Sequence, residues 1–287
     1  MQPRTKTRPR STPARRPRAR RSPLAVAALI ALTCAVVTGA LVGLGRCAAA
    51  PEGGPVGAEP YVSPYDWTLL QRDGDRLAYV ENGEARSQVG VDVSEHQGAI
   101  DWQAAAADGI GFAFVRVGNR GYTEGALYAD ARYAENLDGA SAAGLEVGAY
   151  FFSQATNEQE AREEADFVVE LLAGRRLELP VVFDHEPVSD ANGRANSLDR
   201  QTLTACAAAF CERLEAAGYQ TMVYGNKGDM ARYDRAALGE RPVWFAEYDA
   251  AAPSAQFDFA YWQYTNAGRV AGIPTAVDLN LRLPELP

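Results

Sequence analysis

The chain has 287 residues, of which 47% are hydrophobic, and its formal net charge is −9. This length and composition are enough for a large buried core, in one large domain or two small ones. Residues 1–47 contain ten Lys or Arg and no acid, which leaves 18 basic against 37 acidic residues in the rest of the chain. So acidic a body would repel nucleic acid, and we expect no nucleic-acid partner.

The N-terminal part of the sequence resembles an export segment. We interpret residues 1–22 as a basic cytoplasmic terminus and residues 23–46 as an apolar segment long enough to span a bilayer. Its length favours an uncleaved signal anchor; the alternative is a signal peptide cleaved near Ala48–Ala50. Arg46 stands before Cys47 where a lipoprotein signal has a small residue, which argues against lipidation. In each case the rest of the chain lies outside the cytoplasmic membrane, either tethered or secreted.

A linker and a small extension follow the apolar segment. Residues 47–64 are rich in Pro and Gly and have no core-forming pattern, so we assign them to a linker. Residues 65–88 predict a short hairpin that turns at Asp73-Gly74-Asp75. We expect its aromatic residues to pack on the main domain, because an isolated two-stranded hairpin is marginally stable in water.

From residue 89 to 287 apolar strands alternate with amphipathic helices. The three clearest helical patterns are 128–143, 157–173 and 198–217. The strand patterns are 90–93, 112–117, 146–152, 179–183, 220–224, 243–246, 261–263 and 277–279. Eight strands at this spacing predict an α/β fold, an irregular TIM-like (β/α) barrel with parallel strands and short connections between the last few. A doubly wound open sheet is the alternative, but no glycine-rich phosphate loop follows the first strand.

Cysteine and histidine offer little for metal or redox chemistry. Cys206 and Cys211 lie five residues apart on a predicted helix, too far for an easy disulfide, and we expect buried thiols. The chain has only two His residues, His96 and His185. We therefore expect no metal site and no cofactor.

Acidic residues stand at or near the ends of three predicted strands. Asp92 ends the first strand, and Asp184 and Glu186 end the fourth, on the same face because side chains alternate. Asp278 lies in the eighth strand, which a closed barrel places beside the first. The four acids are therefore expected at one mouth of the barrel. Closely spaced acids beside an apolar core separate each other's pKa values, and a proton-donating acid beside an ionised one can hydrolyse a glycosidic bond.

Aromatic and amide residues are predicted near the same mouth. Tyr150, Tyr224 and Trp262 are candidates for stacking on sugar rings, whereas Phe151 and Trp244 are expected to fill the interior. Asn226 and Gln263 can form hydrogen bonds to hydroxyl or acetamido groups.

Several segments together resemble glycoside hydrolase family 25, the muramidases also called Chalaropsis-type lysozymes. The matching segments are GVDVSEHQG at 90–98, IDW at 100–102, FVRVG at 114–118, GAYFFSQA at 148–155, FDHE at 183–186, WQY at 262–264, GIP at 272–274 and VDLN at 277–280. Many members carry His where this chain has Phe151, and Glu247 adds an acid of unknown role near the mouth.

The resemblance implies cleavage of the β-1,4 bond between N-acetylmuramic acid and N-acetylglucosamine in bacterial peptidoglycan. It implies that Glu186 is the general acid and that Asp184 stabilises the anomeric centre, as a nucleophile or by orienting the substrate's N-acetyl group. It further implies that Asp92 and Asp278 tune Glu186 and hold the sugar. We expect a monomer. A wall-binding module without catalysis and a chitin-type glycosidase are the two alternatives.

Overall fold

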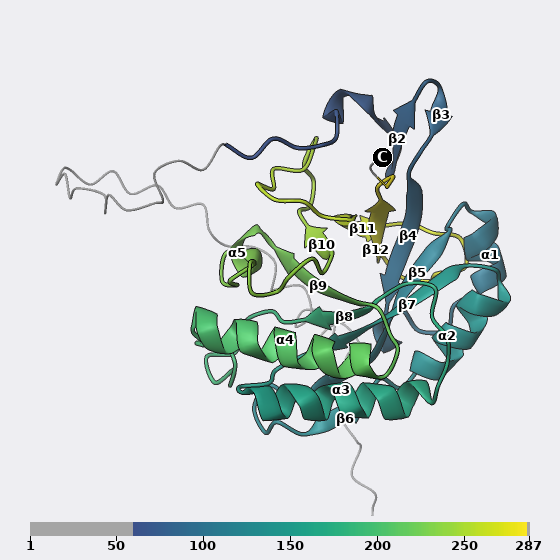
Figure 1. The fold of residues 1–287 in the computed structure, drawn as a ribbon. Helices are drawn as coiled ribbons and strands as arrows, with labels where there is room; N and C mark the ends of the chain where they lie inside the picture. The colour runs from purple at the N-terminus through teal and green to yellow at the C-terminus, as the bar shows by residue number, and fades with distance from the viewer. Residues whose placement is uncertain (1–59, 286–287) are drawn as a thin grey trace, which may run out of the picture. The chain divides into compact units, whose positions relative to one another are not determined.

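The computed structural model describes residues 60–285 of the chain (Figure 1). The predicted basic terminus 1–22, the apolar segment 23–46 and most of the linker 47–64 lie outside these residues. No helix within the described range is long and apolar enough to cross a membrane.

Eight strands form a closed barrel in the described part of the chain. They follow one another around the ring in the order β4-β12-β11-β10-β9-β8-β7-β5, and β4 pairs with β5 to close it. The strands are β4 (Gln88–Val93), β5 (Phe112–Arg120), β7 (Glu146–Phe152), β8 (Val181–Asp184), β9 (Thr221–Asn226), β10 (Val243–Ala246), β11 (Tyr261–Gly268) and β12 (Val277–Arg282). All eight overlap the strands predicted from the sequence, and the closing pair excludes the doubly wound open sheet.

The last strand corrects the prediction of a parallel barrel. β12 runs antiparallel to both of its neighbours, β11 and β4. Residues 269–276 are too few for the crossover that a parallel connection needs, which takes a dozen residues or more, so the chain turns back on itself. The start of β12, rather than its end, therefore lies at the mouth where the parallel strands finish.

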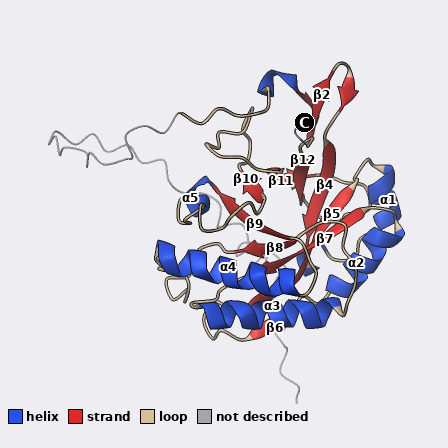
Figure 2. Cartoon of the chain, in the orientation of Figure 1, coloured by secondary structure: helices blue, strands red, loops and turns tan. Residues whose placement is uncertain are grey.

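Helices cover the barrel along its first five strands (Figure 2). They are α1 (Trp102–Ala107), α2 (Tyr133–Ala142), α3 (Glu158–Leu172), α4 (Arg200–Ala216) and the short α5 (Lys227–Met230), with the 3-10 turn η3 (Glu95–Gln97) after β4. Side chains of Asn157 and Asp199 accept hydrogen bonds from the first turns of α3 and α4, which explains why these helices begin where they do.

The helix predicted from residue 128 begins five residues later. Residues 127–129 instead form β6 (Leu127–Ala129), which pairs antiparallel with β5. The buried carboxylate of Asp130 then accepts hydrogen bonds from the backbone N–H groups of Glu95 and Arg132. These bonds hold Asp130 between the end of β6 and the start of α2. The apolar pattern alone did not predict this later start of the helix.

Large aromatic side chains fill the barrel interior below the mouth. Phe112 and Phe114 on β5 are fully buried and lie at 5.9 Å between ring centroids. Glycines on the neighbouring strands make room for them: a Cβ at Gly90 would lie 2.4 Å from the Phe112 ring, and one at Gly148 would lie 2.6 Å from the Phe114 ring. The barrel interior below the mouth is therefore filled by packed side chains.

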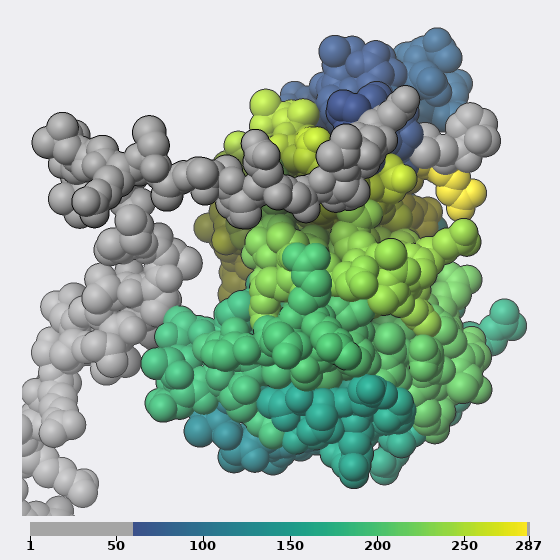
Figure 3. Space-filling model, turned by 60° about the vertical axis from the view of Figure 1, so that its left-hand side comes forward, coloured from purple at the N-terminus to yellow at the C-terminus, as the bar shows by residue number. Residues whose placement is uncertain are grey.

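A small three-stranded sheet precedes the barrel. It consists of β1 (Leu70–Asp73), β2 (Arg76–Glu81) and β3 (Glu84–Ala85) after the 3-10 turn η2 (Trp67–Leu69). Trp67 stacks on Phe259 at 6.0 Å between ring centroids, and Leu77 is buried in the main core. In Figure 3 these early residues, coloured purple-blue, lie against the yellow-green segment that precedes β11. The extension thus packs on the barrel, as its aromatic residues led us to expect.

Candidate active site

The four acids predicted from the sequence line one pocket of about 260 Å³. Asp184 is the last residue of β8 and Glu186 follows two residues later. Asp92 on β4 and Asp278 on β12 are direct partners across two adjacent strands. The pocket therefore collects carboxyl groups from three strands at the end of the barrel where the parallel strands finish.

Burial raises the pKa values of all four carboxyl groups. The pKa of Asp92 is raised to about 6, that of Glu186 to about 7 and that of Asp278 to about 8, in each case mainly because burial penalises the charged form. Burial, followed by the charge of Glu186, holds the pKa of Asp184 well above its usual range. The site therefore retains protons near neutral pH, which is what a proton donor requires.

Asp92 accepts more side-chain hydrogen bonds than the other three carboxylates in the described part of the chain. Its Oδ2 accepts a hydrogen bond from Gln263 Nε2 at 2.9 Å and another from Asn280 Nδ2 at 2.8 Å. Gln263 also accepts hydrogen bonds from two tyrosine hydroxyls, those of Tyr224 at 2.7 Å and Tyr248 at 2.8 Å. The hydrogen bonds from Asn280 and Gln263 oppose the effect of burial on Asp92. They help to keep the pKa of Asp92 below that of Asp278.

The backbone that carries Asp184 and Glu186 is held from behind by residues after β7. The Ser153 N–H donates to the Asp184 carbonyl at 2.7 Å, and buried Gln154 Nε2 donates to the Glu186 carbonyl at 3.1 Å. His185 points to the opposite face, as strand alternation predicts, and its Nδ1 lies 3.1 Å from the Ser153 carbonyl. Burial lowers the pKa of His185 to about 4, so this ring is neutral and structural.

Three of the five predicted substrate-binding residues line the pocket. Tyr150, Tyr224 and Gln263 all face the acids. Trp262 does not: it is fully buried, and its indole Nε1 donates to the Glu247 carbonyl at 2.9 Å. The prediction for Trp262 was wrong because adjacent residues of a strand face opposite ways, so Trp262 and Gln263 cannot both face the interior.

Asn226 is also misplaced by the sequence prediction. Its side-chain oxygen accepts hydrogen bonds from the backbone N–H groups of Gly228 and Asp229, where it caps α5, and the residue does not line the pocket. Asparagine is a preferred cap at the start of a helix, so this structural use was available from the sequence.

Trp244 lies in the barrel interior as predicted, where it also lines the pocket. The prediction for Phe151 was wrong: next to the inward-facing Tyr150, its ring points outward and packs against Phe167 of α3 and Phe210 of α4.

Four residues of the pocket are absent from the predicted site residues: Arg116, Phe152, Trp244 and Tyr248. Arg116 on β5 lines it as the cation beside the acids, with its guanidinium paired to the buried carboxylate of Asp130 at 2.8 Å. A charged residue inside the apolar run 112–117 was the available signal. Tyr248 lines the pocket with 41% of its surface exposed, and nothing in its local sequence separates it from other loop tyrosines.

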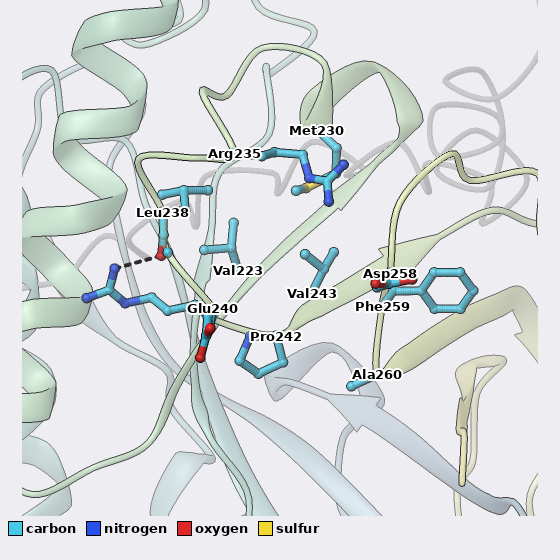
Figure 4. Close-up of a pocket in the computed structure, with 12 residues that line it drawn as sticks. Val223, Met230, Arg235, Leu238, Glu240, Pro242, Val243, Asp258, Phe259 and Ala260 are labelled. Carbon is cyan, nitrogen blue, oxygen red and sulfur yellow. Dashed lines mark hydrogen bonds between the residues drawn. The ribbon is translucent and has the colours of Figure 1, made fainter. Parts of the chain in front are cut away.

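A second hollow of about 430 Å³, drawn in Figure 4, is lined by none of the four acids. Val223 and Val243 line it from β9 and β10, together with Arg235, Leu238 and Asp258. It contains none of the predicted catalytic or substrate-binding residues, so the smaller acidic pocket is the candidate active site.

Comparison with known proteins places these features in a family. Residues 91–273 match the model of the glycosyl hydrolases family 25. Lysozyme M1 of Streptomyces globisporus is 30% identical over 202 residues, which are 67% of this chain and 66% of that protein. The autolytic lysozyme of Clostridium acetobutylicum is 26% identical over 191 residues, 67% of this chain but only 54% of that protein. The solved structure of the bacterial lysozyme from Streptomyces coelicolor is similar with a TM-score of 0.54 and 26% identity, over 67% of this chain and 90% of that one.

Proposed function

Because this chain belongs to glycosyl hydrolases family 25, we propose that it is a muramidase. Its substrate is then bacterial peptidoglycan, and the bond cleaved is the β-1,4 link between N-acetylmuramic acid and N-acetylglucosamine. The observation that carries the proposal is the pocket in which Glu186, with a pKa raised to about 7, lies with three further acids. The names of the two lysozymes that match the chain support the same substrate class.

Glu186 and Asp184 have distinct tasks in this proposal. Glu186 protonates the oxygen of the departing sugar, because it keeps a proton near neutral pH and is only partly buried. Asp184 stabilises the positive charge at the anomeric carbon, directly or by orienting the substrate's acetamido group.

The remaining pocket residues position the glycan. Tyr150 and Tyr224 present ring faces or edges to the sugar, and Tyr248 forms a partly exposed wall of the same pocket. The guanidinium of Arg116 is fixed by Asp130, so its free edge offers a donor to an oxygen of the substrate.

The test is release of reducing ends from purified peptidoglycan by the full chain. We expect Glu186→Gln to lower the rate by about 10²–10⁴-fold, the usual contribution of a positioned general acid. Glu240→Gln, on the wall of the second hollow, is the matched control and should keep the wild-type rate. Mass spectrometry of the products should find muramic acid at the new reducing ends.

Three outcomes would contradict the proposal. Full activity of Glu186→Gln would exclude the assigned proton donor. Binding of wall fragments by the wild-type chain without any turnover would indicate a binding module instead. Faster cleavage of a polymer of N-acetylglucosamine than of peptidoglycan would indicate a chitin-type glycosidase.

We further propose that the chain is exported and tethered to the membrane by residues 23–46, with the barrel outside. The support is the uncharged stretch 24–44 after a basic terminus, and both lie outside the described residues. Cell fractionation and N-terminal sequencing test this: a tethered protein stays with membranes and keeps its first residues, and a soluble protein that begins after residue 47 would refute the tether. Light scattering of the detergent-solubilised protein should give the mass of a monomer.

A further inference from the structure

Asp92 and Asp278 form a carboxyl pair inside the candidate active site. They are register partners on the antiparallel strands β4 and β12, and both line the same pocket. Two neighbouring carboxylates repel each other when both are ionised, which favours a proton on one of them. Which of the two carries that proton decides where the negative charge of the pair lies relative to the substrate.

Trp244 determines the orientation of the Asn280 side-chain amide, because an indole N–H can only donate a hydrogen bond. Its Nε1 donates to Asn280 Oδ1 at 2.8 Å, and its ring is fixed by stacking on Phe114 at 4.8 Å between centroids. The Asn280 oxygen therefore faces Trp244, and the Asn280 amide N–H must face the other way. There it donates to Asp92 Oδ2 at 2.8 Å.

Gln263 points a second amide N–H at the same oxygen. The hydroxyls of Tyr224 and Tyr248 both donate to Gln263 Oε1, at 2.7 and 2.8 Å. This leaves Gln263 Nε2 as the group that faces Asp92 Oδ2, at 2.9 Å. Both amides are almost completely buried, with 3% exposure for Gln263 and 0% for Asn280, so water does not compete for these bonds.

Asp278 has no comparable support. Among residues 60–285, no side chain donates a hydrogen bond to its carboxyl group, which is only partly buried. Two N–H donors stabilise a carboxylate more than a neutral acid, because hydrogen bonds to a charged acceptor are stronger. The difference in donors therefore favours negative charge on Asp92 and the proton on Asp278.

We propose that Asn280 and Gln263 are positioning residues that keep Asp92 ionised and leave Asp278 as the member of the pair that carries the proton. The active site then presents one fixed negative charge from this pair instead of two. The inference deepens the proposed function and rests on it only where activity is measured. The other charged groups that face the pair are Asp184 at the end of β8, Glu186 just after it, and Arg116 on β5.

Asparagine substitutions distinguish the two members. Asp278→Asn keeps a donor toward Asp92, whereas Asp92→Asn replaces the charged acceptor of the Gln263 and Asn280 N–H groups with a neutral amide oxygen. We expect Asp92→Asn to be less stable to heat and to have a rate of peptidoglycan cleavage at least about tenfold below that of Asp278→Asn. Asp138→Asn, exposed on α2, controls for the substitution itself.

A readout without activity separates this inference from the proposed function. In the full chain labelled with ¹³C at aspartate carboxyl carbons, the two variants assign the signals of Asp92 and Asp278. We expect Asp92 to lose its proton at lower pH than Asp278, and Gln263→Leu to narrow the gap. The reverse order of titration, or equal stability and activity of the two asparagine variants, would overturn the inference. The expected order in a chain that fails to cleave peptidoglycan would overturn only the proposed function.

Discussion

Replacement of Arg120 by methionine should destabilise the barrel strongly and in a pH-dependent way. Arg120 ends β5 with 5% exposure, and its Nε donates to the fully buried carboxylate of Glu164 at 2.8 Å. The same guanidinium donates to the carbonyls of Gly125 at 2.7 Å and Glu160 at 2.9 Å. Methionine keeps much of the aliphatic bulk but none of these donors.

The expected magnitude follows from the charge left behind. At a pH where the remaining group is ionised, removal of one partner of a buried ion pair costs about 3–5 kcal/mol, because that charge stays in the interior without compensation. For a domain of this size, each kcal/mol corresponds to roughly 2–4 °C in melting temperature, so we expect a fall of about 6–20 °C. The exposed pair between Arg162 and Glu158 on α3 is the matched control, and Arg162→Met should cost less than about 1 kcal/mol.

The pH dependence gives the sharper test. Burial raises the pKa of Glu164 to about 7 from 4.5, although Ser153 and Arg120 act against it, and loss of Arg120 raises it further. A folded-state pKa above the unfolded value means that the folded protein holds a proton which the unfolded chain has released. Stability therefore falls as pH rises from the unfolded toward the folded pKa, and the Arg120→Met variant continues to lose stability above pH 7.

The assay is urea unfolding of wild type and variants at pH 5 and pH 8.5. The deficit of Arg120→Met should be larger at pH 8.5, and Arg120→Met/Glu164→Gln should recover about half of it, since a neutral amide needs no counter-charge. A deficit that is equal at the two pH values, or no larger than that of Arg162→Met, would refute this reasoning.

Three further predictions concern the site and its support. The rate constant kcat/KM should fall about tenfold per pH unit above pH 7, because Glu186 must be protonated and its pKa is raised to about 7 by burial; a flat profile from pH 6 to 9 would contradict this. Gly148→Ala should lower the free energy of unfolding by about 1–3 kcal/mol, measured in urea, because its Cβ would lie 2.6 Å from the Phe114 ring. Gln154→Leu removes the bond to the Glu186 carbonyl and should lower kcat by about tenfold or more with little change in KM, whereas a change in KM alone would point to substrate binding.

The strands and the acids could be predicted from the sequence because their signals are local. Four apolar residues before Asp184 predict a buried strand, and the spacing of Asp184 and Glu186 predicts a common face. The same alternation, applied strictly, would have removed Trp262 from the substrate-binding residues, since Gln263 next to it faces the pocket. The cap preference of asparagine would likewise have assigned Asn226 to the start of α5.

The direction of β12 could not be predicted from its residue pattern alone. Asp278 reaches the mouth because its strand enters the barrel from that end, and strand patterns are the same in either direction. Only the shortness of residues 269–276 excludes a parallel crossover.

The sequence by itself determined eight strands, a barrel and four acids at its mouth, because these follow from alternation and apolar runs within a few residues. The tertiary structure decided how the acids differ. Asp92 receives its two amide donors from residues that lie 171 and 188 positions away in the chain, and burial by the whole barrel raises the pKa of Glu186 to about 7. Hydrogen bonds and desolvation of this kind depend on atoms that only the folded chain brings together.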